Sequence, residues 1–436
     1  MKNLIISSFL IYSICLFSCA NQKSTYSKAK IFKNKIDTSV LFQNSHVGIY
    51  IYDPITKEKI YSKNEDKYFV PASNTKILTL YACLKTLGDS IPALKYFEKE
   101  DTLFILGTSD PTFLHPDFPL GKTFAFLKNS KSKTIAFSAE NFKNESLGLG
   151  WSWDDYNDYY QTDISNFPMY GNILRVSNID KYQTLNPSYF ASNLKINQLK
   201  SSEIKRVYNE NIFFTNYEIQ SKNKFNQDIP YKTSPDLTVH LLADTLKKNV
   251  ILMNIKSSES FRTLFSLPVD TVYRRMMQVS DNMLAEHLLL LAGGKYSPEI
   301  SSKQSINNIQ NKFLLNLPQK FKWADGSGLS RYNLFTPKSL VVLLERMLNE
   351  FSKEKIYSYM SIGGQSGTLK NAYHTKTPFV YAKTGTLSGV FNQSGYLITK
   401  KGKTLIFSFM NNNFVDSASK YRIITSELLT WIHENY

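Results

Sequence analysis

Apolar residues recur at helical spacing from Ile77 to Leu84, and this pattern predicts a buried helix that begins near Ser73. Pro71 fits just before it, where a first helical turn tolerates a residue without an N–H. Ser73 and Lys76 then share a face, because residues three apart on a helix are neighbours. A hydroxyl beside an amine is a candidate nucleophile beside a candidate base, and free N–H groups at a helix start suit an oxyanion.

Alternating apolar and polar positions predict strands near both ends of the chain. His46 to Tyr52 and Lys59 to Tyr61 predict a β-hairpin that leads into the Ser73 helix. Three more strands and a final amphipathic helix are expected over Phe379 to Thr384, Gly389 to Ile398, Lys403 to Met410 and Ser417 to Asn435.

The middle of the chain has a different pattern, in which turn residues separate short strands. The expected strands are Thr102 to Leu106, Thr134 to Ser138, Ile173 to Val176 and Asn211 to Thr215. One helix, Leu237 to Lys247, interrupts them after a Ser234-Pro235 cap. Residues 97–257 are therefore predicted to form a β-rich insertion of one or two subdomains.

Beyond residue 257 the pattern becomes helical. Helical spacing runs from Val269 to Leu291, a range that contains Ser280-Asp281-Asn282, and Thr336-Pro337 opens a helix that ends near Phe351. We therefore expect residues 36–96 and 258–436 to form one domain that the insertion splits. A polar, lysine-rich linker is expected over residues 20–35.

The N-terminal segment predicts export. Leu4 to Phe17 is an apolar run that is short for a membrane span but suits a secretory signal. The run ends in Leu16-Phe17-Ser18-Cys19, which resembles a bacterial lipoprotein signal, so residues 1–19 are predicted to be a signal peptide with lipidation at Cys19. The predicted location is the periplasmic cell envelope, and an uncleaved membrane anchor is the alternative.

Composition and net charge narrow the classes of molecule that the protein could bind. The 436 residues are 42% hydrophobic, which is enough for a large core and for two or three domains. Lys plus Arg outnumber Asp plus Glu by 52 to 36, so an anionic partner is expected. No nucleic-acid module is found, and for an exported chain we interpret the charge as matching an anionic wall or membrane surface.

Cysteine and histidine usage predicts neither disulfides nor metal sites. After removal of the signal only Cys83 would remain, and its apolar helix makes it a core residue. The histidines lack paired ligand spacing, so no metal and no cofactor are expected.

Two further motifs accompany Ser73-x-x-Lys76. They are Ser280-Asp281-Asn282 and Lys383-Thr384-Gly385, which ends a predicted strand and precedes Thr386. The Ser-x-x-Lys spacing alone recurs by chance in this serine- and lysine-rich chain. All three in this order resemble the motifs of serine penicillin-binding proteins and class A β-lactamases.

Each member has a chemical reason to be present, because acyl transfer needs a nucleophile, a proton route and dipoles for the oxyanion. Ser73 is the candidate nucleophile. Lys76 serves as base only when neutral, and burial beside the Lys383 cation would lower its pKa from about 10.4 toward roughly 7–8. Ser280 and Lys383 would relay a proton to the leaving group, and Asn282 would bond the substrate amide.

The strand that carries the third motif would hold the substrate. Gly385 has no side chain to block an extended peptide along that strand. The backbone N–H groups of Ser73 and Thr386 are the expected oxyanion hole. The hydroxyls of Thr384 and Thr386 suit a terminal carboxylate.

Ser73 and Ser280 are much farther apart in sequence than in a compact β-lactamase. This arrangement resembles the D-alanyl-D-alanine carboxypeptidase/endopeptidase group of low-molecular-mass penicillin-binding proteins, whose catalytic domain is split by a large insertion. Supporting stretches are Leu106 to Thr112, Gly150 to Asp155, Ser280 to Glu286, Asp325 to Arg331 and Ser366 to Lys370. Ser109 departs from the pattern, because it stands at a glycine-like position.

The resemblance covers nearly all of the mature chain and implies an α+β fold. That fold is a penicillin-binding/β-lactamase-like domain, an antiparallel sheet flanked by helices, split by the β-rich insertion. The implied partners are peptidoglycan stem peptides and β-lactam antibiotics as covalent inhibitors. The resemblance also implies that Trp151, Asp154, Tyr159 and Arg331 bind a diamino-acid side chain of the stem peptide, and a packed tryptophan corner is the alternative for this group.

Three functions are therefore considered. The first is a serine DD-peptidase that forms an acyl-enzyme on Ser73 and removes terminal D-alanine or cuts D-alanine crosslinks. The second is a β-lactamase, which the insertion and the lack of a recognisable deacylating glutamate motif disfavour; Glu286 is interpreted as structural. The third is a catalytically silent wall-binding lipoprotein, which the intact motif residues disfavour.

Overall fold

The computed structural model describes residues 28–180, 182–198, 201–255 and 260–436. The predicted signal peptide, Cys19 and the first part of the predicted linker lie outside the described residues. Within those ranges, no helix combines the length and hydropathy that crossing a bilayer requires.

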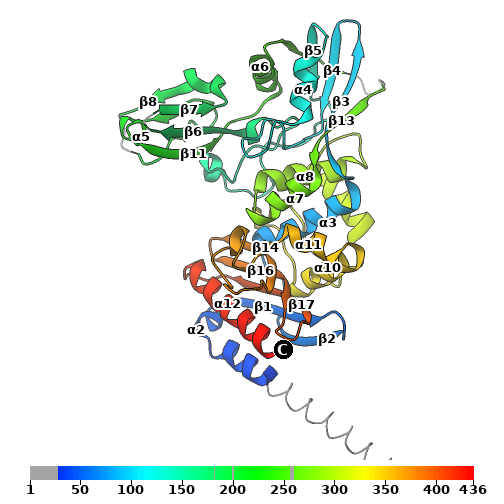
Figure 1. Cartoon of the computed structure of the whole chain (residues 1–436), viewed down its shortest axis with the longest axis vertical. Coiled ribbons are helices and arrows are strands. Elements are labelled where there is room, and N and C mark those ends of the chain that lie inside the picture. Colours follow the sequence, from blue (N-terminus) through cyan, green and yellow to red (C-terminus); the bar gives the residue numbers. More distant parts are fainter. Residues whose placement is uncertain (1–27, 181, 199–200, 256–259) are drawn as a thin grey trace, which may run out of the picture.

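A six-stranded sheet forms the lower half of the molecule in Figure 1. All of its neighbouring strands are antiparallel, in the order β14-β15-β16-β17-β1-β2. The bounds are β1 (His46–Asp53), β2 (Glu58–Lys63), β14 (Ser361–Ile362), β15 (Val380–Leu387), β16 (Val390–Ile398) and β17 (Thr404–Asn412). The predicted hairpin and the three predicted C-terminal strands are confirmed.

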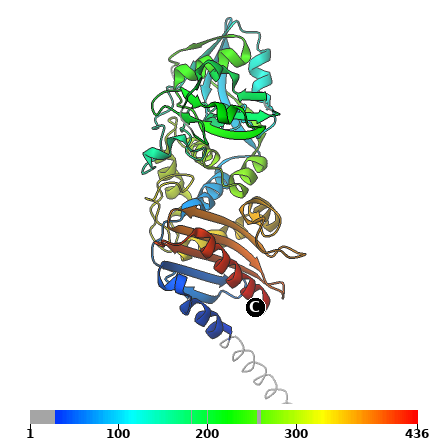
Figure 2. The same ribbon diagram turned by 90° about the vertical axis from the view of Figure 1, so that its left-hand side faces the viewer.

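Helices cover both faces of this sheet, because alternate strand residues point to opposite sides. On β1, Val47, Ile49 and Ile51 pack with α12, while Tyr50 belongs to the core built by the central helices. Figure 2 shows α12 lying along the sheet. The helices are α2 (Val40–Gln43), α3 (Lys76–Thr86), α7 (Val269–Gln278), α8 (Asn282–Gly294), α9 (Ser302–Ile309), α10 (Pro337–Glu350), α11 (Lys353–Tyr359) and α12 (Ala418–Asn435).

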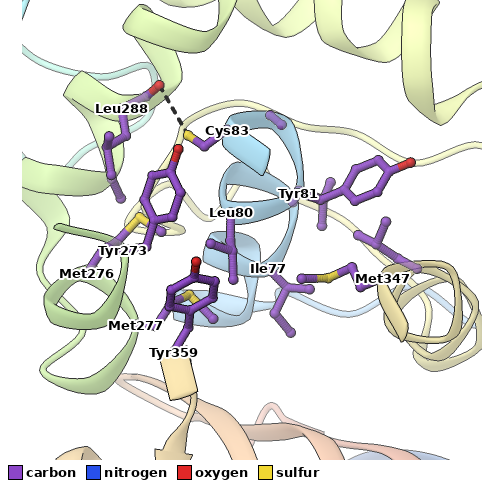
Figure 3. Packing of buried hydrophobic residues seen from close by; sticks show 14 of the residues in the cluster. Ile77, Leu80, Tyr81, Cys83, Tyr273, Met276, Met277, Leu288, Met347 and Tyr359 are labelled. Atoms are coloured by element: carbon purple, nitrogen blue, oxygen red, sulfur yellow. Dashed lines mark hydrogen bonds between the residues drawn. The ribbon is translucent and has the colours of Figure 1, made fainter. Parts of the chain in front are cut away.

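The α3 helix lies at the centre of the larger core. Ile77, Leu80 and Cys83 are buried against α7 and α8, as Figure 3 shows, with Met347 of α10 and Tyr359 of α11 beside them. The Cys83 thiol lies 3.5 Å from the Leu288 carbonyl, and burial raises its pKa. Cys83 is therefore a core residue, as predicted.

Residues 28–37 are helical, so the predicted linker was wrong over its described part. Phe32 and Ile36 are fully buried against the sheet, and the Phe32 ring stacks on Trp431 of α12 at 5.5 Å. These two apolar residues, four apart, give a helix one buried stripe that the lysine-rich composition conceals.

The insertion forms the upper half of the molecule and contains three small sheets (Figure 1). Their orders are β12-β5-β4-β3-β13, β11-β6-β7 and β8-β10-β9. The strand bounds are β3 (Ser90–Lys99), β4 (Thr102–Gly107), β5 (Thr134–Ser138), β6 (Ile173–Ile179), β7 (Tyr182–Asn186), β8 (Leu194–Ile196), β9 (Lys205–Arg206), β10 (Phe213–Thr215), β11 (Lys224–Pro230), β12 (Asn249–Leu252) and β13 (Arg262–Pro268). The helices are α4 (Lys122–Asn129), α5 (Tyr217–Gln220) and α6 (Pro235–Leu246), the last capped by Ser234 as predicted.

The insertion is longer than the sequence pattern indicated. Strands β3 and β13 pair antiparallel in its five-stranded sheet, so this sheet begins at Ser90 and ends at Pro268. The predicted limit at residue 97 falls inside β3. Pro92 obscured this strand because proline interrupts strand patterns; it lies opposite Phe265, beside a register shift.

The predicted helix from Val269 to Leu291 is two helices, α7 and α8. Ser280 interrupts them with a left-handed backbone, φ +65°, and Asp281 caps α8 by accepting from the Leu284 N–H at 3.0 Å. Such a conformation is uncommon for a residue with a Cβ. The break places Ser280 in the wall of the cleft that Ser73 also lines.

Ser109 also has a left-handed backbone, with φ +69°. It is buried, and its N–H donates to the Asn166 carbonyl at 2.7 Å. This position therefore requires the left-handed backbone that glycine adopts most easily, although serine occupies it.

Candidate active site

Ser73 lies on a short 3-10 turn, η1 (Ala72–Thr75), that runs directly into α3. Side chains from the sheet hold this turn. The Asn74 amide donates to Ser394 Oγ of β16 at 3.0 Å, and the Val70 N–H donates to Asn412 of β17 at 2.7 Å. Ala72 has φ +47°, a conformation with a steric cost that these contacts maintain.

The Lys76 amine lies at the centre of the motif residues. Its Nζ is 3.0 Å from Ser73 Oγ, 2.6 Å from Asn282 Oδ1 and 2.8 Å from the Ser327 carbonyl. Asn282 Oδ1 and the Ser327 carbonyl only accept hydrogen bonds, whereas a serine hydroxyl either donates or accepts. A neutral amine would therefore donate its two N–H groups to those acceptors and keep its lone pair for the Ser73 hydroxyl.

Burial favours this neutral form. The Lys76 side chain is fully buried, and burial lowers its pKa to about 8, although nearby acids, chiefly Glu286 and then Asp325, raise it. The sequence-based expectation also invoked the Lys383 charge, but burial is the main cause.

Lys383 of β15 contacts the second motif. Its Nζ donates to Ser280 Oγ at 2.8 Å and to the Thr384 carbonyl at 2.7 Å. Burial lowers the pKa of Lys383 well below its usual range, and the Lys76 charge adds to this effect. Because two buried ammonium groups repel each other, the arrangement favours one neutral amine in the pair.

Strand β15 passes directly against the Ser73 turn at Gly385. A Cβ at this position would lie 2.8 Å from the Pro71 carbonyl oxygen and 2.9 Å from the Ser73 nitrogen. Glycine is therefore required for the close approach of β15 to η1, a reason that differs from the expected room for substrate. Beside it, Thr384 donates to Thr368 Oγ1 at 2.6 Å, and Thr386 is exposed.

These segments border a cleft of about 920 Å³. From the motifs, the cleft is lined by Ser73, Ser280, Asn282, Thr384 and Thr386. The Lys76 and Lys383 side chains are buried behind this wall. The three motifs, widely separated in sequence, therefore meet at one site.

Asn282 is already engaged within the protein. Its Oδ1 accepts from Lys76, and its Nδ2 donates to the Tyr160 carbonyl at 2.9 Å. A substrate amide would share or replace these bonds. The contact with Tyr160 also joins the second motif to the insertion.

Two of the four residues expected at the diamino-acid site lie elsewhere. Tyr159 and Arg331 line the cleft, whereas Trp151 and Asp154 do not. The Trp151 indole donates to Asp325 Oδ2 at 2.9 Å and packs beside a small buried cluster, the packed corner considered as the alternative. Asp154 is exposed on η2 (Trp153–Asn157), and the next residue, Asp155, lines the cleft instead.

Two buried acids, Glu286 and Asp325, shape the loop that supports Lys76. Glu286 accepts from the Gly326 and Ser327 N–H groups at 2.9 and 2.8 Å, so its predicted structural interpretation fits the contacts. Asp325 accepts from the Gly328 and Ser330 N–H groups. The Asp325-Gly326-Ser327-Gly328 turn was visible in the sequence, but its carbonyl contact with Lys76 was not.

A row of ion pairs in the cleft wall was not predicted. Arg175 bonds both carboxylate oxygens of Asp228, at 2.7 and 2.8 Å, and also pairs with Asp117 at 2.7 Å. Arg275 pairs with the other oxygen of Asp117 at 2.6 Å and lies 3.4 Å from Asp281. The row thus joins the insertion to Asp281, the residue between Ser280 and Asn282 in the second motif.

The described residues offer no metal site. Across the described ranges, no group of three or more His, Cys, Asp or Glu side chains is placed to hold a metal ion.

The model of the D-Ala-D-Ala carboxypeptidase 3 (S13) family matches residues 33–434. The chain belongs to this family. It is 22% identical over 422 residues to the D-alanyl-D-alanine carboxypeptidase DacB of Haemophilus influenzae, an alignment that covers 86% of this chain and 87% of that protein.

The fold agrees with solved structures of a penicillin-binding protein. The crystal structure of penicillin-binding protein 4 from Haemophilus influenzae matches with a TM-score of 0.73 at 20% identity, over 92% of this chain and 98% of the other. The same protein complexed with a β-lactam matches with a TM-score of 0.69 at 17% identity, over the same shares.

The predicted family, α+β fold and enzyme class are confirmed. The S13 family member described here is a serine DD-peptidase, the first of the three functions considered.

Proposed function

We propose that Ser73 is the nucleophile of this DD-peptidase and Lys76 its general base. Ser73 Oγ attacks the carbonyl carbon of the penultimate D-alanine and gives its proton to neutral Lys76. The tetrahedral intermediate collapses with cleavage of the C–N bond, and an acyl-enzyme ester remains on Ser73. Water then attacks the ester carbon, Lys76 returns its proton to the Ser73 oxygen as the C–O bond breaks, and a proton released by the water restores Lys383.

Ser280 and Lys383 serve the leaving amine. Ser280 gives its hydroxyl proton to the amine, and Lys383, 2.8 Å away, replaces that proton. Burial is the main cause that lowers the pKa of Lys383, and a neutral Lys76 removes the second cause, the repulsion by its charge. The single observation that carries the proposal is that each serine at the cleft has its own lysine. Lys76 contacts Ser73 and Lys383 contacts Ser280, and these residues come from three distant segments of the chain.

The substrate lies along β15. The backbone N–H groups of Ser73 and Thr386 stabilise the oxyanion, while the hydroxyls of Thr384 and Thr386 bind the terminal carboxylate, for which Thr384 gives up its bond to Thr368. Both threonines line the cleft.

A fluorescent penicillin tests the nucleophile. Stable labelling of the wild type, lost in Ser73→Ala and retained in Ser109→Ala, would support the assignment. Rapid turnover of the label would instead indicate a β-lactamase, and no labelling of the wild type would indicate a silent protein.

The insertion side of the cleft is proposed to recognise the diamino-acid side chain of the stem peptide. Arg331 provides a cation and Asp155 an acid in the cleft lining, and Tyr159 a ring between solvent and cleft. Asp155→Asn should reduce hydrolysis of a peptide bearing diaminopimelate more than that of a simple D-Ala-D-Ala peptide. Asp154→Asn is the matched control, and equal losses on both substrates in Asp155→Asn would reject the role.

The balance of carboxypeptidase and endopeptidase action is to be measured on purified sacculi. Release of free D-alanine reports the first activity, and conversion of crosslinked to uncrosslinked muropeptides reports the second. β-Lactams are proposed as covalent inhibitors of both.

The protein is proposed to reside at the periplasmic side of the cell envelope, held by a lipid on Cys19, which becomes the first mature residue after cleavage between Ser18 and Cys19. The lipoprotein-like sequence Leu16-Phe17-Ser18-Cys19 supports this. Incorporation of a labelled fatty acid into the wild-type protein, lost in Cys19→Ser, would support the lipid anchor. A wild-type protein that takes up no label would reject it.

A further inference from the structure

One face of the β11-β6-β7 sheet is open to solvent and continues the wall of the cleft. In Figure 1 this sheet projects to one side of the insertion. Its buried face carries Leu174, Val176 and Ile229, which belong to the insertion core. Because strand side chains alternate, the residues between them form the opposite face.

Strand register defines this open face as three rows across the sheet. We call it the open sheet face. Its rows, each given in the order β11, β6, β7, are Asp228-Arg175-Asn186, Asn226-Ser177-Thr184 and Lys224-Ile179-Tyr182. Paired residues in antiparallel strands share a face, so these nine side chains form one surface.

The face leads away from the active site. Ile173, Arg175 and Asp228 line the cleft, whereas the second and third rows do not. With about 3.3 Å per strand residue, the face extends about 13 Å beyond the first row. A polymer whose stem peptide occupies the cleft would therefore have a surface on which to continue.

The side chains suit a polar polymer rather than a protein core. The middle row offers a hydroxyl from Ser177, which donates to Asn226 Oδ1 at 2.6 Å, and a hydroxyl from Thr184. The outer row places an exposed tyrosine, Tyr182, and the amine of Lys224 on either side of Ile179. Amides and hydroxyls hydrogen-bond sugar hydroxyls, an aromatic ring packs on a sugar face, and an ammonium attracts carboxylates.

We propose that the open sheet face binds the polymeric part of peptidoglycan, a glycan segment with its attached peptide, while one stem peptide occupies the cleft. The proposal rests on the proposed function, because it requires a stem peptide at Ser73. It adds a second substrate contact region, which makes intact wall polymer a better substrate than a short peptide.

The test compares the double variant Tyr182→Ala, Asn226→Ala with the wild type on two substrates. On a short D-Ala-D-Ala peptide and in penicillin labelling, rates should be unchanged. On purified crosslinked sacculi, product release should fall about tenfold, the effect expected for the loss of two modest contacts.

Tyr217→Ala is the matched control. Tyr217 is 69% exposed, compared with 79% for Tyr182, and lies on α5. Asn178 points to the buried side of β6 and donates to the carbonyl of Ile219 in α5, so α5 lies on the other side of this sheet. This control should leave both activities unchanged.

Each outcome decides a different claim. Wild-type processing of sacculi by the double variant, or an equal loss on the short peptide, would overturn the sheet-face proposal. Absence of penicillin labelling in the wild-type protein would overturn the proposed nucleophile instead, and co-sedimentation with sacculi would then test the face by itself.

Discussion

Lys76 Nζ lies 2.6 Å from Asn282 Oδ1, so the second motif holds the amine that serves the first. Together with the Ser327 carbonyl, Asn282 accepts both N–H groups of a neutral lysine. The remaining lone pair faces Ser73. The asparagine therefore orients the proposed base in the free enzyme, whatever it contributes to substrate binding.

Acylation should depend on pH through Lys76. Its pKa is about 8 because burial disfavours the charged form. Below that pH the amine is protonated and has no lone pair for the Ser73 proton, so the rate should rise with pH and level off above about 8. Penicillin labelling rates measured from about pH 6 to pH 10 check this. A flat profile would contradict the role of Lys76 as base.

Glu286→Gln should shift that rising limb to lower pH. The Glu286 charge raises the pKa of Lys76, while burial raises the pKa of Glu286 itself to about 8, so its removal lowers the Lys76 pKa in the upper part of the pH range, where Glu286 is ionised. Both Glu286 oxygens accept backbone N–H groups. In the glutamine variant the amide NH₂, which is a donor, would face one of these N–H donors. This mismatch should lower the unfolding free energy by about 1–3 kcal/mol. The labelling profile and a urea melt measure the two effects. The exposed Glu299→Gln should change neither, and an unshifted midpoint in Glu286→Gln would refute the coupling.

Asp117→Asn should slow acylation without contacting the substrate peptide bond. Asp117 accepts from Arg175 and Arg275, and Arg275 also lies beside Asp281, which caps α8. Charge-assisted hydrogen bonds are stronger than hydrogen bonds between neutral groups, so loss of the Asp117 charge should lower the unfolding free energy by about 2 kcal/mol. The penicillin labelling rate should fall several-fold.

The matched control for this row is Asp101→Asn. Asp101 pairs with Lys133 on the surface, where both side chains are largely exposed, and such pairs contribute little. Asp117→Glu should restore part of the rate. Equal labelling rates in Asp117→Asn and Asp101→Asn would show that the row does not position the second motif.

Phe32→Ala should destabilise the catalytic domain by about 3–5 kcal/mol, because it removes a fully buried ring that stacks on Trp431. Ile31→Ala is the control, since Ile31 is 47% exposed, and should change stability by less than about 0.5 kcal/mol. Urea unfolding measures both. Similar midpoints for the two variants would mean that residues 28–35 act as the linker first expected.

The sequence predicted the parts of the fold that repeat a local signal. Helix periodicity and the Thr336 and Ser234 caps located α10 and α6, and alternation located β15, β16 and β17. The three motifs also indicated chemistry, because their residue types are unusual as an ordered set. These signals depend only on neighbours along the chain.

Other features depend on residues that meet only after folding. Arg175, Asp117 and Arg275 pair across long separations, and nothing near any one of them in the sequence indicates its partners. Trp151 was expected in the cleft, but Asp325 binds its indole. The left-handed backbone of Ser280 was hidden because the apolar spacing continues on both sides of it.

The pairing of β3 with β13 means that the chain leaves the enzyme core and returns to it at one place. The segment between these two strands is therefore a single insertion between α3 and α7. Evolution can enlarge, trim or exchange such an appendage while the catalytic machinery keeps its own architecture. Related hydrolases with very different upper halves would then share one ancestral lower half.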